Sequence, residues 1–361
     1  MSKKIIGIIL AGAILLSGCN TGKISQSSVS ETDPAVSSES SESTKIVITD
    51  ETTEPSETTK IEGKYEFNPH LYSKKLGDII PKEHYEALYN LIDALREGKD
   101  TFACASQEAY DWATNDGTLN NFFPAACMKV SGKSNDGSTP FENGVGRVYL
   151  NMPADEFIKR ENQFEADVEE ILNTWLEYDD NEFEKAIKLY DYMESTFTYG
   201  DITPSETNDG SDYKAFQLKK GVCEHMASLY AYLLMQVGIE AMNIGIFEPD
   251  MCHAWTYAII DGKSYHIDAT WALKNQYNSD LVLDYFMMSD KRREGTGCLL
   301  NDITVQILPK FWANKYDNLD FKAADDKYDV LQNSTFKGLD EENKILFYND
   351  AYGNTQELRY A

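Results

Sequence analysis

The chain has few basic residues, and this shortage limits its partners. Its 361 residues include 33 lysines and arginines against 60 aspartates and glutamates, which gives a formal net charge of −27 at pH 7. A protein that neutralises nucleic-acid phosphates needs lysine and arginine, so we expect no nucleic-acid partner. Attraction to cationic peptides or amines would be weak and screened by salt, and a simply solvated acidic surface is the plainer interpretation.

Long apolar runs are also scarce. Lys3 and Lys4 precede an apolar run over residues 5–16, which is too short for an ordinary transmembrane helix. The run ends in Leu-Ser-Gly-Cys at residues 16–19, which resembles the bacterial lipoprotein signal that is cleaved before a lipidated cysteine. We therefore expect a signal peptide over 1–18, a diacylglyceryl anchor on Cys19 and an extracytoplasmic, membrane-anchored protein. Cleavage elsewhere by the ordinary signal peptidase is the alternative.

Aromatic residues are missing between residues 20 and 64, where serine, threonine and glutamate dominate. Such a segment cannot bury enough apolar surface to offset the entropy of ordering, so we expect a disordered tether over 19–64. The remaining chain is rich in tyrosine, phenylalanine and leucine and can bury a sizeable core. We divide it into an accessory region over 65–150, a catalytic domain over 151–300 and an extension over 301–361.

Apolar spacing predicts helices over 81–96, 155–178, 181–196 and 223–237. Residues 117–150 contain glycine, asparagine and proline and are interpreted as loops and short strands. The tail over 303–361 suggests short strands and a hairpin. The fold class is therefore α+β, with the helix that begins at Cys223 packed on an antiparallel sheet.

Cysteine is scarce, and one of the six cysteines has suitable catalytic partners. Cys223, His253 and Asp268 follow one another in the order of a nucleophile, a base and an orienting acid. Cys223 opens a predicted helix, where free N–H groups and the helix dipole favour a thiolate and can hold an oxyanion. We interpret the other cysteines of the folded part as small buried apolar residues, namely Cys104, Cys127, Cys252 and Cys298.

The base and the acid fall on one predicted hairpin. Two β-prone runs, 252–260 and 263–268, are separated only by Asp261-Gly262, the preferred pair for a type I′ turn. If residue 260 pairs with residue 263, Trp255 faces Asp268. His253 and Asp268 are then diagonal neighbours on one face, roughly 7 Å apart at Cβ.

These stretches resemble the transglutaminase-like superfamily, which has a papain-like core. The matching motifs are Gly-Val-Cys at 221–223 with Ala227, His-Ala-Trp at 253–255, and His-Ile-Asp-Ala-Thr-Trp at 266–271. The resemblance extends over roughly residues 155–290. It implies Cys223 as nucleophile, His253 as base and Asp268 as orienter, with no cofactor.

The chain departs from many relatives beside these residues. His225 and Met226 stand where Gly-Tyr is common, and Thr256 stands where asparagine is common. These departures put the substrate pocket in question and leave the triad intact. We expect four further side chains to line the cleft or to support the triad from behind, namely His225, Trp255, His266 and Trp271.

A zinc site is the main chemical alternative, because Cys223, His225, Cys252, His253 and His266 include enough nitrogen and sulfur ligands. Residues two apart on a helix point in nearly opposite directions, and neighbours on a strand point to opposite faces. Only one of each pair could bind easily, so we expect no metal.

The expected reaction is acyl transfer through a thioester, ending in hydrolysis of a peptide or amide bond. The substrate would be a protein or peptide, cell-wall peptide included. Two alternatives remain: a transglutaminase that cross-links proteins through an amine, and a non-catalytic surface or cell-wall binding module that keeps the triad as a scaffold.

Overall fold

A computed structural model describes residues 63–134, 137, 140–202, 209–248, 251–273, 280–298, 300, 304–305 and 320–361. Residues 62–361 form a single compact unit. The expectations for the signal peptide, for Cys19 and for most of the tether fall outside the described residues. No helix in the described part of the chain has both the length and the apolar character needed to cross a bilayer.

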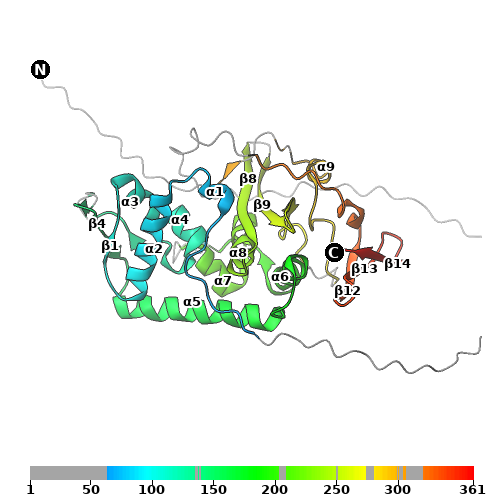
Figure 1. Ribbon diagram of the computed structural model, residues 1–361, viewed down its shortest axis with the longest axis horizontal. Helices are drawn as coiled ribbons and strands as arrows, with labels where there is room; N and C mark the ends of the chain where they lie inside the picture. The colour runs from blue at the N-terminus through cyan, green and yellow to red at the C-terminus, as the bar shows by residue number, and fades with distance from the viewer. Residues whose placement is uncertain are drawn as a thin grey trace, which may run out of the picture. The chain divides into compact units, whose positions relative to one another are not determined.

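The central feature is an antiparallel sheet with the strand order β10-β9-β8-β11. Its strands are β8 (Glu240–Glu248), β9 (Met251–Ile260), β10 (Lys263–Ile267) and β11 (Thr304–Val305). Helix α8 (Cys223–Gln236) packs against β8 and β9 near the middle of Figure 1. The predicted α+β fold, with the cysteine-bearing helix on an antiparallel sheet, is confirmed.

The turn between β9 and β10 has the predicted conformation. Asp261 and Gly262 both have positive φ angles, 51° and 73°, as a type I′ turn requires. Ile260 pairs with Lys263, and Tyr257 pairs with His266. The predicted register is therefore confirmed, and it places Trp255 on the face toward which Asp268 projects.

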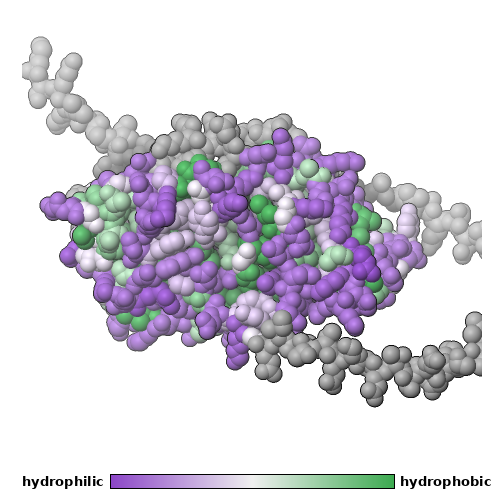
Figure 2. All heavy atoms as spheres, viewed as in Figure 1, coloured by the Kyte–Doolittle hydropathy of each residue, from purple (hydrophilic) through white to green (hydrophobic). Residues whose placement is uncertain are grey.

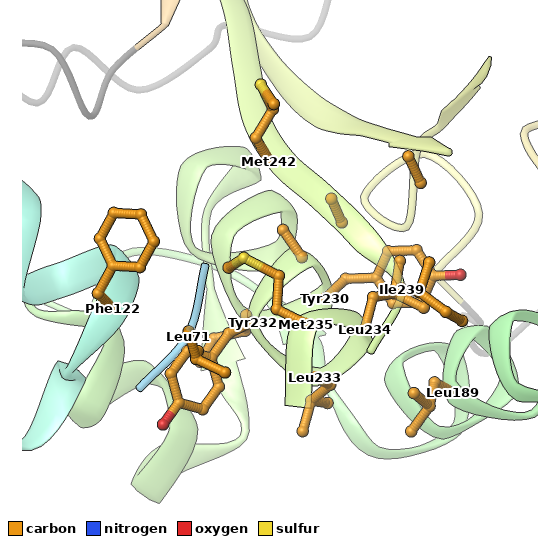
Figure 3. Packing of buried hydrophobic residues seen from close by; sticks show 14 of the residues in the cluster. Leu71, Phe122, Leu189, Tyr230, Tyr232, Leu233, Leu234, Met235, Ile239 and Met242 are labelled. Carbon is orange, nitrogen blue, oxygen red and sulfur yellow. The ribbon is translucent and has the colours of Figure 1, made fainter. Parts of the chain in front are cut away.

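Helix α8 is buried on nearly every side, which is why its sequence is almost continuously apolar. Figure 3 shows side chains of α8 packed near Ile239, which precedes β8, near Met242 of β8 and near Leu189 of α6 (Glu182–Thr196). The Tyr230 hydroxyl donates to the carbonyl of Ala186 on α6 at 2.9 Å. This packing holds the N-terminus of α8 in a fixed place relative to β9.

The accessory region is more helical than the sequence suggested. Helix α2 (Lys82–Arg96) was predicted, but α3 (Gln107–Ala113) was not, and α4 (Asp116–Phe122) replaces the start of the predicted loop. The Asn115 side chain caps α4 by accepting from the N–H of Gly117 at 2.9 Å. Burial of Leu119 and Phe122 then outweighs the weak helix propensity of glycine and asparagine.

Two long predicted helices are confirmed with small shifts at their ends: α5 (Ala154–Trp175) and α6. Other helical segments of the described residues are short and include α1 (Lys74–Gly77), η1 (Pro124–Ala126), α7 (Asp212–Leu218), α9 (Asp290–Glu294) and η3 (Asp329–Leu331). Short strands complete the rest; they are β1 (Thr101–Ala103), β2 (Val130–Ser131), β3 (Phe141–Glu142), β4 (Val145–Arg147), β5 (Tyr149–Leu150), β6 (Thr198–Tyr199) and β7 (Lys220–Gly221).

The C-terminal residues form a three-stranded antiparallel sheet of β12 (Thr335–Asp340), β13 (Ile345–Asn349) and β14 (Thr355–Arg359). The prediction of short strands and a hairpin is confirmed for this part of the tail. The sheet docks on α6, where the rings of Phe183 and Tyr360 stack at 4.4 Å. Hydrophilic side chains cover most of the face shown in Figure 2, in keeping with the acidic composition.

Candidate active site

Cys223 is the first residue of α8, and it is only 7% exposed. The Val222 N–H, just before the helix, donates to Nδ1 of His225 at 3.2 Å. The other imidazole nitrogen, Nε2, lies 3.0 Å from the carbonyl oxygen of Gly210 and donates to it. Burial lowers the pKa of His225, which favours the neutral ring that this pattern requires. His225 therefore fixes the start of the helix that carries Cys223.

Gly221 allows this arrangement because its backbone passes very close to His225. A Cβ atom on residue 221 would lie 2.7 Å from the Cβ of His225. Any side chain at this position would push His225 away from the helix start. Close packing against His225 therefore explains the glycine of the Gly-Val-Cys motif.

Strand β9 meets the first turns of α8 through small residues. Cys223, Ala227 and Ala254 form a buried cluster of their own. The hydroxyl of Thr256 donates to the carbonyl of Ala227 at 2.8 Å. Thr256, one of the departures from many relatives, thus connects β9 to α8. His253 directly precedes Ala254, the residue that contacts Cys223.

His253 and Asp268 form a buried hydrogen-bonded pair. Nε2 of His253 lies 2.6 Å from Oδ2 of Asp268, and the two side chains are 5% and 0% exposed. The second carboxylate oxygen accepts from the N–H groups of Thr270 and Trp271 at 3.0 and 3.1 Å. Burial by itself acts to raise the pKa of Asp268. Nearby His253 and Arg293 and the hydrogen bonds outweigh it and lower this pKa to about 2.

Arg293 on α9 is a member of the site that the sequence reasoning missed. Its Nη1 donates to Oδ2 of Asp268 at 2.9 Å, and its side chain is fully buried. The guanidinium carbon lies 4.2 Å from the ring centroid of Trp255 and 4.7 Å from that of Trp271. The only signal for it in the sequence is the basic run Lys-Arg-Arg at 291–293, in which nothing distinguishes the buried arginine from its neighbours.

The two tryptophans flank the imidazole of His253. The Trp271 ring stacks on it at 4.5 Å with an interplanar angle of 12°, and the Trp255 ring is 6.2 Å away at 24°. Trp255 is 1% exposed and belongs to the core, whereas Trp271 is 36% exposed. Trp271 therefore supplies the open wall beside the base, and Trp255 supplies the buried one.

His266 supports the site from behind Trp255. Its Nδ1 accepts the indole N–H of Trp255 at 3.0 Å, and its Nε2 lies 3.0 Å from Oδ1 of Asp290. With Nδ1 as an acceptor, the proton sits on Nε2 and is donated to the carboxylate. Burial lowers the pKa of His266, in keeping with a neutral ring.

The described residues contain no group of three or more histidine, cysteine or acidic side chains arranged to hold a metal ion. The zinc alternative therefore has no support in this part of the structure. No disulfide joins the five cysteines of the described region. Cys104, Cys127 and Cys298 are buried as expected, but the expectation for Cys252 is wrong. Cys252 is exposed because it lies at the beginning of β9, one residue before His253.

Part of the chain matches a known protein family. Residues 170–269 match the family model of the transglutaminase-like superfamily. A search of curated proteins found no match.

Two solved structures are similar over part of their length. One is a candidate cysteine protease from Cytophaga hutchinsonii, with 21% identity, a TM-score of 0.25, and coverage of 29% of this chain and 38% of that one. The other is a candidate protease from Parabacteroides distasonis, with 15% identity, a TM-score of 0.25, and coverage of 36% and 34%. The chain thus spans less than two-fifths of either structure. By the family match, residues 170–269 of this chain are a domain of the transglutaminase-like superfamily.

Proposed function

We propose that this protein is an extracytoplasmic, lipid-anchored cysteine enzyme that hydrolyses a peptide or amide bond by acyl transfer. The observation that carries the proposal is the buried contact of 2.6 Å between His253 Nε2 and Asp268 Oδ2. It belongs to a domain in which Cys223 begins α8 and packs against the neighbour of His253. A cysteine at a helix start beside a histidine that is itself oriented by a carboxylate has the parts of an activated thiol nucleophile.

Each side chain then has one task. Asp268 holds Nε2 of His253, which leaves Nδ1 to accept the thiol proton of Cys223. The thiolate attacks the substrate carbonyl, and N–H groups in the first turn of α8 stabilise the oxyanion. His253 returns the proton to the leaving amine as the carbon–nitrogen bond breaks, which leaves a thioester on Cys223.

The second half of the reaction decides the product. Water activated by His253 attacks the thioester, releases an acid and restores the thiol. If an amine attacks in place of water, the product is a new amide bond, as in protein cross-linking. We propose water as the acceptor and a protein or peptide as the substrate, cell-wall peptide included, with no cofactor.

Labelling of the thiol tests this proposal directly. A thiol-directed electrophile at mildly acidic pH should modify the wild-type protein at Cys223, as shown by peptide mapping, and should leave Cys223→Ala unmodified at the corresponding peptide. Exposed Cys252 serves as an internal reference for an ordinary thiol. If Cys223 reacts no faster than Cys252, the protein is a non-catalytic module on the same fold.

A second assay distinguishes the acceptors. Peptides with glutamine amides are incubated with the enzyme, with and without a primary amine, and analysed by mass spectrometry. Hydrolysis changes the mass of the peptide without the amine, whereas transamidation adds the mass of the amine. Exclusive amine incorporation would replace hydrolysis by cross-linking in the proposal.

A further inference from the structure

Asp268 uses a single carboxylate oxygen to bind two side chains, His253 and Arg293. Oδ2 lies 2.6 Å from Nε2 of His253 and 2.9 Å from Nη1 of Arg293. Both donors reach the same atom from different elements, β9 and α9. Arg293 lies outside the matched part of the chain, residues 170–269, so the family match does not assign it.

Burying the charged side chain of Arg293 lowers the stability of the fold. The side chain is fully buried, and its Nε and Nη2 atoms have no hydrogen-bond partner among the residues that the structure describes. Unpaired N–H groups in the interior are unfavourable, and the faces of Trp255 and Trp271 offset only part of that cost. An apolar side chain of similar size would fill the space between the two indoles without these unpaired groups.

Among the described residues, three other titratable groups that interact electrostatically with Asp268 are neutral near pH 7. Burial raises the pKa of the Tyr190 hydroxyl on α6, of the Tyr285 hydroxyl and of the Cys298 thiol, and all three face Asp268. Burial lowers the pKa of His266, which faces Arg293. Arg293 is therefore the fixed positive charge that His253 meets at this carboxylate.

We propose that Arg293 is a positioning residue that holds the Asp268 carboxylate behind His253 and limits the affinity of the imidazole for a proton. This inference rests on the proposed function, because it concerns the base of that reaction. Arginine stays charged at every accessible pH, so its effect on His253 is constant. The guanidinium of Arg293 binds the same carboxylate oxygen that stabilises the imidazolium. It also repels the positive charge that forms when His253 accepts a proton.

The consequence concerns the return of the proton to the leaving group. An imidazole paired only with a buried carboxylate would bind its proton too tightly to return it readily to a leaving group. Arg293 shares the carboxylate and so lowers the affinity of the imidazole for its proton. If Arg293 had a purely structural role, a neutral side chain of similar size would serve equally well, and the affinity of His253 for a proton would not depend on the charge at residue 293.

The test follows the protonation of His253 without using activity. In the Cys223→Ala background, the imidazole of His253 is titrated by NMR; the chain has five histidines, and the spectrum of His253→Ala assigns the signal. Arg293→Met removes the charge and keeps an unbranched chain between the indoles, and Arg293→Lys keeps the charge. We expect the His253 midpoint to rise by roughly one pH unit in Arg293→Met and to return toward its original value in Arg293→Lys.

Folding of each variant is checked by circular dichroism and thermal melting. If Arg293→Met does not fold, Arg293→Gln serves as the neutral variant. An unchanged or lower midpoint in a folded neutral variant would overturn the proposal. Because the nucleophile is absent throughout, this result is independent of whether Cys223 proves reactive in the labelling experiment, so failure of the proposed function and failure of this inference are separate outcomes.

Discussion

The indole N–H of Trp255 donates to Nδ1 of His266 at 3.0 Å, and this bond holds the buried wall beside His253. We expect His266→Ala to leave the indole N–H without an acceptor and to lower the free energy of unfolding by about 1–3 kcal/mol. Activity should fall much less than in Cys223→Ala, because His266 does not contact the reacting atoms.

Urea denaturation and the rate of Cys223 labelling measure the two effects. His266→Gln offers an amide oxygen in the same region and should recover part of the stability; no recovery would argue against the hydrogen bond as the cause.

Replacing the proposed nucleophile should abolish the reaction. We expect Cys223→Ala and Cys223→Ser to form no acyl-enzyme, since alanine has no nucleophile and a serine hydroxyl has a far higher pKa than a thiol. His253→Ala should be nearly as inactive. Acyl-enzyme formation is followed by mass spectrometry of the intact protein.

Cys252→Ser is the matched control: it changes an exposed cysteine one residue from His253 and should retain activity. If it is as inactive as Cys223→Ser while folded, the wrong sulfur has been assigned, and bound metal should be measured directly.

Changing the orienting acid should produce a weaker but clear defect. Asp268→Asn keeps the size of the side chain but removes the charge that fixes the orientation of His253 and pairs with Arg293. We expect kcat to fall by about 10²–10⁴-fold with the fold preserved, as the logic of catalytic triads predicts. Near-wild-type kcat in a folded Asp268→Asn protein would exclude Asp268 as the orienter. Steady-state kinetics together with thermal melting give both values.

The anchor is tested separately from the chemistry. We expect Cys19→Ser to leave the precursor unprocessed or to release the protein from the membrane fraction, because serine cannot carry the diacylglyceryl group. Activity of a purified fragment that begins at Tyr65 should match that of the full chain, since residues 62–361 form a compact unit. Cell fractionation and intact mass measure the outcome. Normal processing and membrane retention of Cys19→Ser would rule out lipidation at this residue.

Stability should depend on pH through the buried histidines. Burial lowers the pKa of His225 and of His266, so the unfolded chain binds protons below about pH 6.5 that the folded state resists. Acidification through this range therefore favours unfolding, by up to about 1.4 kcal/mol per pH unit for each histidine. Asp268, with its pKa lowered to about 2, stabilises the fold above its unfolded pKa and loses that contribution between about pH 4 and 2.

Urea denaturation from pH 8 to pH 5 isolates the histidine effect by comparison. The free energy of unfolding of His266→Gln should vary less with pH than that of the wild type, because one buried group that resists protonation has been removed. The His70→Gln variant is the matched control, since His70 is partly exposed and pairs with Asp93 at the surface. Parallel curves for wild type and His266→Gln would show that His266 does not contribute.

Much of the core could be predicted from turn residues and apolar spacing in the sequence. Asp261 and Gly262 fit a type I′ turn, and a two-residue turn allows only one register, so the shared face of His253 and Asp268 followed from neighbouring residues alone. The apolar spacing after Cys223 likewise fixed the start of α8. These features depend on residues that are close in the chain, and propensity and periodicity report on such features well.

Tertiary structure decided which distant side chains join this core. Arg293 reaches Asp268 across 25 residues, and only the docking of α9 distinguishes it from the arginine beside it. His225 could have faced the cleft, but it accepts from the N–H of Val222 and donates to the carbonyl of Gly210, so it caps α8. Burial also made a helix of residues 116–122, whose composition favours loops. The sequence by itself therefore determined the helix that begins at Cys223 and the hairpin that carries His253, because short-range turns and periodicity encode them. The charge environment of His253 was decided only by packing, because burial and long-range contacts leave no local pattern in the chain.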